Sequence, residues 1–130
     1  MTKPQPHIIA DAARGIRHVF IRNLELQAQI GVYHHEVGKM QPVRINVDMA
    51  VEDGTDLNDD LTKVVDYGVI EAKIRAILAE GHLNLVETLA ERIASACFED
   101  ARVRTARVRV EKLHALSAAE SAGVEIERTR

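Results

Sequence analysis

The sequence of 130 residues has no tryptophan, one cysteine, and only two tyrosines and two phenylalanines. So few aromatic rings cannot form the stacking surfaces that bind single-stranded nucleic acids. The lone Cys97 excludes an internal disulfide and a CxxC metal site, and it favours a reducing, cytoplasmic setting. No apolar stretch approaches the roughly 20 residues that span a bilayer, and no signal-peptide core is evident, so we expect no membrane association.

An excess of charge of one sign is also lacking. Lysine and arginine total 17 against 20 aspartates and glutamates, the formal charge is −3, and no segment is a long basic run. Binding of a phosphate backbone needs a concentrated basic patch, so we expect no nucleic-acid partner. The length fits one domain with its own core. We expect a flexible tail over residues 1–16 and a single domain over residues 17–130.

Alternating apolar and polar residues predict four β-strands. The first two cover residues 17–32 and 42–52 and are joined by a loop over residues 31–41. The apolar phase of the first strand slips by one residue at Asn23, which predicts a bulge. After a turn-rich segment, 53–66, and a helical region, alternation returns in two further runs, with the apolar residues Ala106, Val108 and Val110, then Ala122, Val124 and Ile126.

Two helices are predicted between the strand pairs, because apolar residues recur there at three- and four-residue spacing. The first runs from about Val69 to Gly81, and the second carries a stripe of Leu85, Leu89, Ile93 and Cys97. Asn84 followed by Glu87 has the form of a capping box, which predicts the start of the second helix.

The resulting order, β-β-α-α-β-β, predicts an α+β fold with a four-stranded antiparallel sheet and two helices on its apolar face. The other face carries unusually many charges: Arg44, Asp48, Arg107, Arg109, Glu125 and Glu127. Two alternatives stay open. The protein is a monomer with a solvated sheet face, or its two free sheet edges pair between copies and close a barrel around a wet interior.

Motifs for common chemistries are missing. His34, His35 and Glu36 are consecutive, so their side chains diverge and we expect no metal site. No Walker loop, GxGxxG or GxSxG occurs, and Cys97 lacks an evident histidine partner, so no cofactor is expected. Polar residues remain at four element boundaries, namely Glu36, Tyr67, Glu87 and Lys112. Each has an ordinary explanation: loop charge, half-buried aromatic, helix cap and strand-end charge.

Five segments in order nevertheless match a known pattern. They are IGVYHHEVGKMQ (30–41), DDLTKVVDYGVI (59–70), LNLVETLAERIA (83–94), VRVEK (108–112) and GVEIER (123–128). Through these segments the chain resembles the dihydroneopterin aldolase family over about residues 17–128. The resemblance implies the tunnelling fold, in which four subunits join edge to edge into a barrel ring, commonly stacked in pairs as an octamer. It also implies active sites between neighbouring subunits.

The resemblance assigns roles as well. It implies retro-aldol cleavage of 7,8-dihydroneopterin to glycolaldehyde and 6-hydroxymethyl-7,8-dihydropterin, in folate biosynthesis, without metal or Schiff base. By matching position Lys112, Tyr67 and Glu36 are catalytic, with Glu36 five residues before Gln41 as in the family. Glu87 anchors the pterin, and Val86, Asp66 and Val65 also bind it. We expect Glu87 to point into the pocket, so that the capping box is only partial.

Two questions stay open at this point. Desolvation would favour Lys112 as a neutral base, whereas a nearby Glu36 carboxylate would favour it as a proton donor. The segment Lys112–Leu116 looks more like the related dihydroneopterin triphosphate 2′-epimerases, for which Lys39 and Lys63 are candidate phosphate ligands. A third possibility is a non-catalytic pterin-binding or ring-forming protein on the same fold.

Overall fold

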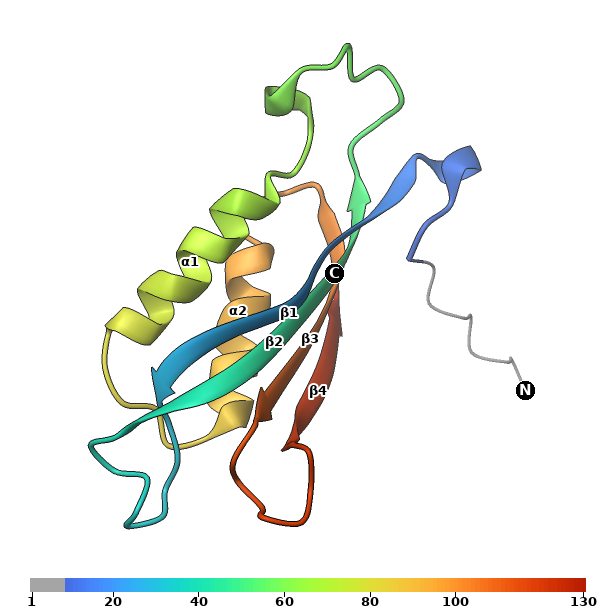
Figure 1. The fold of residues 1–130 in the computed structure, drawn as a ribbon. Helices are drawn as coiled ribbons and strands as arrows, with labels where there is room; N and C mark the ends of the chain where they lie inside the picture. Colours follow the sequence, from blue (N-terminus) through green and yellow to red (C-terminus); the bar gives the residue numbers. More distant parts are fainter. Residues whose placement is uncertain (1–8) are drawn as a thin grey trace.

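The computed structural model describes residues 9–130. Eight residues of the expected tail, 1–8, lie outside this range, and within it a short 3-10 helix, η1 (Ala12–Arg14), precedes the first strand. Figure 1 shows two layers, a twisted sheet and a pair of helices. The elements follow the predicted order: β1 (Ile16–Gln29), β2 (Met40–Glu52), η2 (Leu61–Lys63), α1 (Tyr67–Ala79), α2 (Val86–Cys97), β3 (Val103–Lys112) and β4 (Ala122–Thr129).

The sheet has the strand order β1-β2-β3-β4, and every neighbouring pair is antiparallel. The α+β prediction is therefore confirmed. The register of β1 against β2 shifts between Ile21 and Leu24, and Asn23 takes a left-handed φ of 55°. The side chain of Asn46 accepts a hydrogen bond of 2.8 Å from the Asn23 amide. The bulge predicted from the slip in apolar phase is thus present, and it returns the apolar residues of β1 to the core face.

Both helices pack on the same face of the sheet and close the core between the layers (Figure 1). Most residues of the predicted stripes are buried: Ile70, Ile74 and Ile77 in α1, and Leu89, Ile93 and Cys97 in α2. Leu85 is the exception, because it precedes α2 and is 46% exposed. Opposite them lie the alternating residues of the two central strands, Val43, Ile45, Val47, Met49, Val108 and Val110, all fully buried. Each such side chain stabilises the fold by about 1.5–3 kcal/mol.

The start of α2 differs from the prediction. Leu85, with extended backbone (φ −126°, ψ 140°), is the N-cap, and no side chain accepts a hydrogen bond there. The capping box of Asn84 and Glu87 is therefore wrong, because Asn84 lies one residue too early to cap the helix. In contrast, Asp66 caps α1 through a 2.8 Å hydrogen bond that its carboxylate accepts from the Gly68 amide.

The second face of the sheet carries many charged side chains, as predicted, together with the exposed ring of Phe20. Arg107 contacts Glu127 at 2.8 Å, and His18 lies 2.7 Å from Asp48. Strands β1 and β4 form the two edges of the sheet. No helix within residues 9–130 is both long and apolar enough to cross a membrane.

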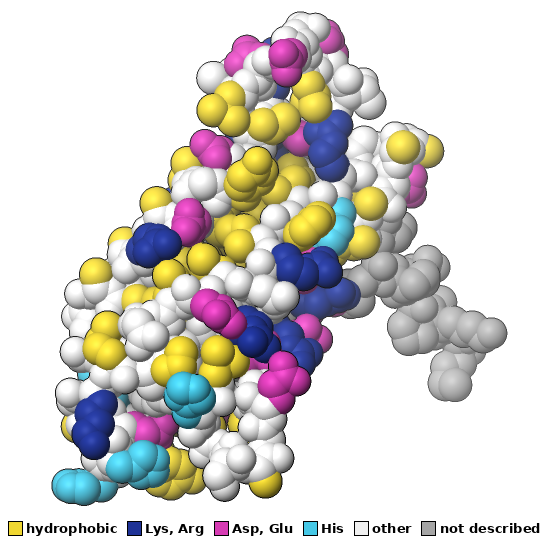
Figure 2. All heavy atoms as spheres, in the orientation of Figure 1, with side chains coloured by type: hydrophobic (Ala, Val, Ile, Leu, Met, Phe, Trp, Pro, Cys, Tyr) yellow, Lys and Arg dark blue, Asp and Glu magenta, His cyan; other side chains and the backbone are white. Residues whose placement is uncertain are grey.

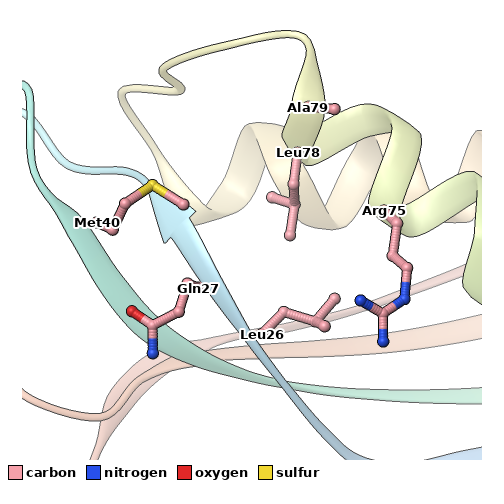
Figure 3. A pocket seen from close by; sticks show the side chains of 6 residues that line it. All are labelled: Leu26, Gln27, Met40, Arg75, Leu78 and Ala79. Atoms are coloured by element: carbon pink, nitrogen blue, oxygen red, sulfur yellow. The ribbon is translucent and has the colours of Figure 1, made fainter.

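A groove of about 410 Å³ lies beside the β1 edge. Figure 3 shows Leu78 of α1 pointing across it toward β1, with Met40 on one side and Arg75 on the other. None of the predicted site residues lines this groove.

Candidate functional site

Glu36 is the centre of a hydrogen-bonded cluster at one end of the sheet. It lies in the loop between β1 and β2, yet its side chain is only 6% exposed. The Gln41 amide donates a 2.8 Å hydrogen bond to Oε2, and the backbone N–H of Tyr33 donates a 3.3 Å bond to Oε1. Gln41 also donates to the Ile30 carbonyl at 2.6 Å, which fixes its amide against the end of β1. A charged loop residue of the ordinary kind would be solvated, so the loop-charge explanation is wrong.

Lys112 completes this cluster from the other half of the chain. It is the last residue of β3 and pairs with Val43 of β2. Val43 follows Gln41 by two residues, so Lys112 lies beside the part of β2 that carries Gln41. Its Nζ lies 2.8 Å from Glu36 Oε2, and its side chain is 16% exposed. The two predicted catalytic residues are thereby brought into direct contact, and the ion pair presents Lys112 as an ammonium donor.

The contacts around Glu36 hold its carboxyl in the ionised form. Burial alone would raise the pKa of the Glu36 carboxyl, but the hydrogen bonds from Lys112, Gln41 and the Tyr33 amide outweigh it and leave the pKa below its ordinary value. An ionised, fully hydrogen-bonded carboxylate is a weak base and a strong acceptor. It suits orienting hydroxyl groups better than removing protons.

Gly31 forms the floor beneath the carboxylate, a role that the sequence analysis missed. Its backbone takes a φ of 123°, and a Cβ at this position would lie 2.2 Å from Cδ of Glu36. Only a residue without a side chain leaves room for the carboxylate. The positive φ at a strand end was not visible in the sequence, where Gly31 reads as an ordinary turn glycine.

Glu87 lies at the same end of the molecule, in the first turn of α2. The segment before it is tied to the end of β1, because Leu83 forms a parallel bridge with Ile30. Glu87 is exposed, and within residues 9–130 its carboxylate has no hydrogen bond or ion pair. Its neighbour Val86 is half-buried against the core. The helix dipole favours a negative group at this position, and the carboxylate remains available to a ligand.

Tyr67 lies at the opposite end of the sheet from Lys112. The guanidinium of Arg102, just before β3, donates a 3.3 Å hydrogen bond to the Thr62 carbonyl, which places the segment leading into α1 near the beginning of β3. Lys112 is the last of the ten residues of β3, so it lies about 30 Å along the strand from Arg102. In Figure 1 the start of α1 and the end of β3 lie at opposite ends of the molecule.

The residues beside Tyr67 have structural contacts of their own. Asp66 caps α1, and Val65 is buried in the core. Tyr67 itself is 63% exposed, so the explanation of a half-buried aromatic closing the core is wrong. Within one chain, the predicted site residues therefore form two separate groups.

A small pocket of about 170 Å³ opens beside Glu36. It is lined by the potentially cationic side chains His35, Lys39 and His114, together with Glu36, Met40, Gln41 and Ala115. Figure 2 shows histidine side chains gathered at this lower end of the molecule. Lys63 lies elsewhere, on η2, where its Nζ donates to the Asp56 carbonyl at 3.4 Å.

Among residues 9–130, no three side chains of His, Cys, Asp or Glu are grouped as metal ligands would be. Burial raises the pKa of the Cys97 thiol to about 12, which keeps it protonated and unreactive.

Comparison with known proteins shows to which family the chain belongs. The family model described as dihydroneopterin aldolase matches residues 19–127, which is most of the chain. The chain belongs to the dihydroneopterin aldolase family. The matched range includes Glu36, Tyr67, Glu87 and Lys112, and the resemblance proposed from the five sequence segments is confirmed.

Relatives within the dihydroneopterin aldolase family carry two names. A dihydroneopterin aldolase of Streptomyces coelicolor is 33% identical over 95 residues, 72% of this chain and 80% of the relative. A dihydroneopterin triphosphate 2′-epimerase of Pseudomonas aeruginosa is 30% identical over 112 residues, 85% of this chain and 90% of the relative.

Two solved structures of dihydroneopterin aldolases share the fold. The structure from Burkholderia thailendensis, bound to guanine, is 34% identical in sequence to this chain and has a TM-score of 0.78. The match covers 89% of this chain and 93% of the chain in that structure. The structure from Escherichia coli, in complex with neopterin, is 27% identical in sequence and has a TM-score of 0.76. The match covers 85% of this chain and 97% of the chain in that structure.

Proposed function

We propose that this protein cleaves 7,8-dihydroneopterin by a retro-aldol reaction to 6-hydroxymethyl-7,8-dihydropterin and glycolaldehyde, as a step of folate biosynthesis. The observation that carries the proposal is the 2.8 Å contact of Lys112 with the buried Glu36, at the end of the molecule where Glu87 is unpaired within residues 9–130. Membership of the family and the relative named dihydroneopterin aldolase support it.

Glu87 is proposed to anchor the pterin, together with Val86, Asp66 and Val65. A pterin presents adjacent N–H donors on its 2-amino-4-oxo edge, and one carboxylate can accept both. Guanine, bound in one related structure, has the same arrangement of donors, and neopterin, bound in another, is itself a pterin. Because Val65 is buried and Asp66 caps α1, their contribution is proposed to come from backbone groups.

The chemistry proposed needs neither a metal nor a Schiff base. Removal of the proton from the 2′-hydroxyl lets the C1′–C2′ bond break, and glycolaldehyde leaves. The electron pair of that bond forms a C1′=C6 double bond while the C6=N5 π pair moves onto N5, giving an aza-enolate anion. A proton then adds to C1′ and restores the ring imine. The protein has to supply a proton acceptor, a proton donor and a fixed orientation.

We assign these tasks to three side chains. Lys112 does the acid–base work, directly or through water, and its pairing with Glu36 favours donation of the proton to C1′. Glu36 stays ionised and accepts hydrogen bonds from the side-chain hydroxyls of the substrate. Tyr67 relays the proton taken from the 2′-hydroxyl.

This assignment requires two chains for each site, because Tyr67 and Lys112 lie at opposite ends of one sheet. We propose a homo-oligomer, a tetrameric ring that pairs into an octamer, in which the Tyr67 end of one chain meets the Lys112 end of the next. The free edges β1 and β4 offer backbone groups for pairing. Large apolar side chains are also exposed near Tyr67, namely Leu61 and Val69. A cytoplasmic location is proposed with this function.

Epimerisation of dihydroneopterin triphosphate at C2′ is the second candidate. The observation that favours it is the pocket beside Glu36, because His35, Lys39 and His114 can together attract phosphate groups extending from the reacting side chain. The epimerase of Pseudomonas aeruginosa among the relatives supports the same alternative.

An assay with dihydroneopterin, its monophosphate and its triphosphate in parallel tests these proposals. Glycolaldehyde release from dihydroneopterin, unchanged by EDTA and without a borohydride-trapped adduct, is the expected result. A strong preference for the triphosphate, with inversion at C2′, would favour the epimerase instead. Binding of neopterin without turnover of any of the three substrates would indicate a non-catalytic pterin-binding protein.

A further inference from the structure

We propose that His82 is a positioning residue for the Glu36–Lys112 pair, acting through the backbone of Gly31. This inference rests on the proposed function for its kinetic consequences, but its structural part concerns the substrate-free protein. His82 lies in the connection between α1 and α2 and is not among the residues assigned above.

The contact that carries the proposal joins two distant parts of the chain. Nε2 of His82 lies 2.7 Å from the carbonyl oxygen of Gly31, a separation of 51 residues in sequence. A carbonyl can only accept, so the imidazole donates from Nε2. Its Nδ1 is buried and has no hydrogen-bond partner within the described residues. The hydrogen bond therefore places a proton on Nε2.

Gly31 is held on both of its backbone groups by the same short segment. Its N–H donates a 2.9 Å hydrogen bond to the Leu83 carbonyl, while its own carbonyl accepts from His82. The Leu83 N–H in turn donates to the Gln29 carbonyl at 2.9 Å. Two adjacent residues, His82 and Leu83, thus hold the two peptide groups that flank the α-carbon of Gly31.

The position of this α-carbon matters because the Glu36 carboxylate lies directly against it. A Cβ on Gly31 would fall within 2.4 Å of Cδ and both carboxylate oxygens of Glu36, so the glycine α-carbon is the surface beneath the carboxylate. Gln41, Tyr33 and Lys112 hold the carboxylate at its two oxygens. Without the His82 hydrogen bond, the Gly31 carbonyl can rotate and the carboxylate loses its fixed support.

Three variants test the role. In His82→Gln the side-chain amide nitrogen can reach the place of Nε2, whereas in His82→Asn the shorter amide cannot. His18→Asn is the matched control, because it removes another half-buried imidazole hydrogen bond, to Asp48 on the opposite sheet face. We expect His82→Asn to lower kcat about 10- to 100-fold with little change in KM, as displacement of reacting groups does. His82→Gln and His18→Asn should stay within about threefold of the parent protein.

A readout without substrate separates this inference from the proposed reaction. In the substrate-free protein, NMR titration of the Glu36 carboxyl should show its pKa rising in His82→Asn and staying low in His82→Gln. If the parent protein cleaves no pterin, the proposed function fails while this titration still tests His82. An unchanged Glu36 titration and kcat in His82→Asn would overturn the inference, as would equal losses in His82→Asn, His82→Gln and His18→Asn.

The parent protein offers a test that requires no variant to fold. Nitrogen-15 spectra of the imidazole rings report which nitrogen carries the proton. The inference expects Nε2 of His82 to carry a proton near neutral pH. A ring protonated at Nδ1 alone cannot donate to the Gly31 carbonyl and would overturn it.

Discussion

The Nζ of Lys112 lies 2.8 Å from Oε2 of Glu36, although 76 positions separate the two residues in the chain. One residue ends β3 and the other sits in the loop before β2, so the pairing of these two strands creates the contact. The contact brings a carboxylate beside the amine, which supports the proposed role of Lys112 as a proton donor.

The pH dependence of stability should report this pair. The folded-state pKa of Glu36 is lowered, so its stabilising effect is fully present above the ordinary carboxyl pKa and is lost as the pH falls through the lowered value. Glu36→Gln should reduce the free energy of unfolding at pH 7 by about 1–3 kcal/mol. The difference between the two proteins should shrink toward pH 3 in urea denaturation at fixed protein concentration. A difference equal at both pH values would contradict this assignment.

Gly31→Ala should disturb the carboxylate directly. The new Cβ would overlap Glu36, and the φ of 123° is unfavourable for alanine, so we expect a stability loss of about 1–3 kcal/mol and a higher Glu36 pKa. Gly38→Ala is the matched control, because Gly38 also has a positive φ, of 77°, but nothing lies within 4 Å of its added Cβ. Thermal unfolding and carboxyl titration of both variants make the comparison. Equal Glu36 pKa values in the two variants would argue against the floor role of Gly31.

Glu87→Gln should weaken pterin binding more than turnover. Loss of a charged acceptor for two N–H groups predicts a neopterin Kd higher by about 10- to 100-fold, with a smaller change in kcat at saturation. Thr88→Ala changes an exposed neighbour in the same helical turn and serves as the control. Calorimetric titration with neopterin measures the effect. Unaltered affinity in Glu87→Gln would remove this residue from the binding site.

Mixing two inactive variants should restore activity if each site draws on two chains. In Tyr67→Phe and Lys112→Ala, every site of the homo-oligomer lacks one group. Random mixed oligomers, refolded together in equal amounts, carry both intact groups at about a quarter of their interfaces. Glycolaldehyde release should recover accordingly. If the mixture stays as inactive as its components, Tyr67 and Lys112 do not meet across an interface.

The periodicity of the sequence was sufficient to predict the four strands and the two helices of the fold. It was insufficient to predict details that depend on tertiary contacts. Alternation located all four strands, and the phase slip at Asn23 identified the bulge. The capping box at Asn84 failed: the helix begins at Val86, and the backbone just before it is tied to the end of β1 by the Leu83–Ile30 bridge. A local capping signature contains no information about such a long-range constraint.

The candidate site was predictable only in part, for a related reason. Glu36, Tyr67, Glu87 and Lys112 were identified by resemblance, since nothing in their spacing shows that the first and the last touch. The supporting residues were missed: Gly31 matters through its φ and His82 through a carbonyl 51 residues away. Both properties arise from how the α1–α2 connection packs on the end of β1.

Replacement of Lys112 tests the central claim most directly. Lys112→Ala is compared with Lys73→Ala, which removes a partly exposed lysine paired with Glu99 on the helical layer. Single-turnover release of glycolaldehyde from dihydroneopterin is measured beside the Kd for neopterin. We predict a loss of about 10²- to 10⁴-fold in rate for Lys112→Ala, as for removal of an acid–base group, with the Kd within about threefold and Lys73→Ala unaffected. Glycolaldehyde release by Lys112→Ala at the rate of the parent protein would contradict the account.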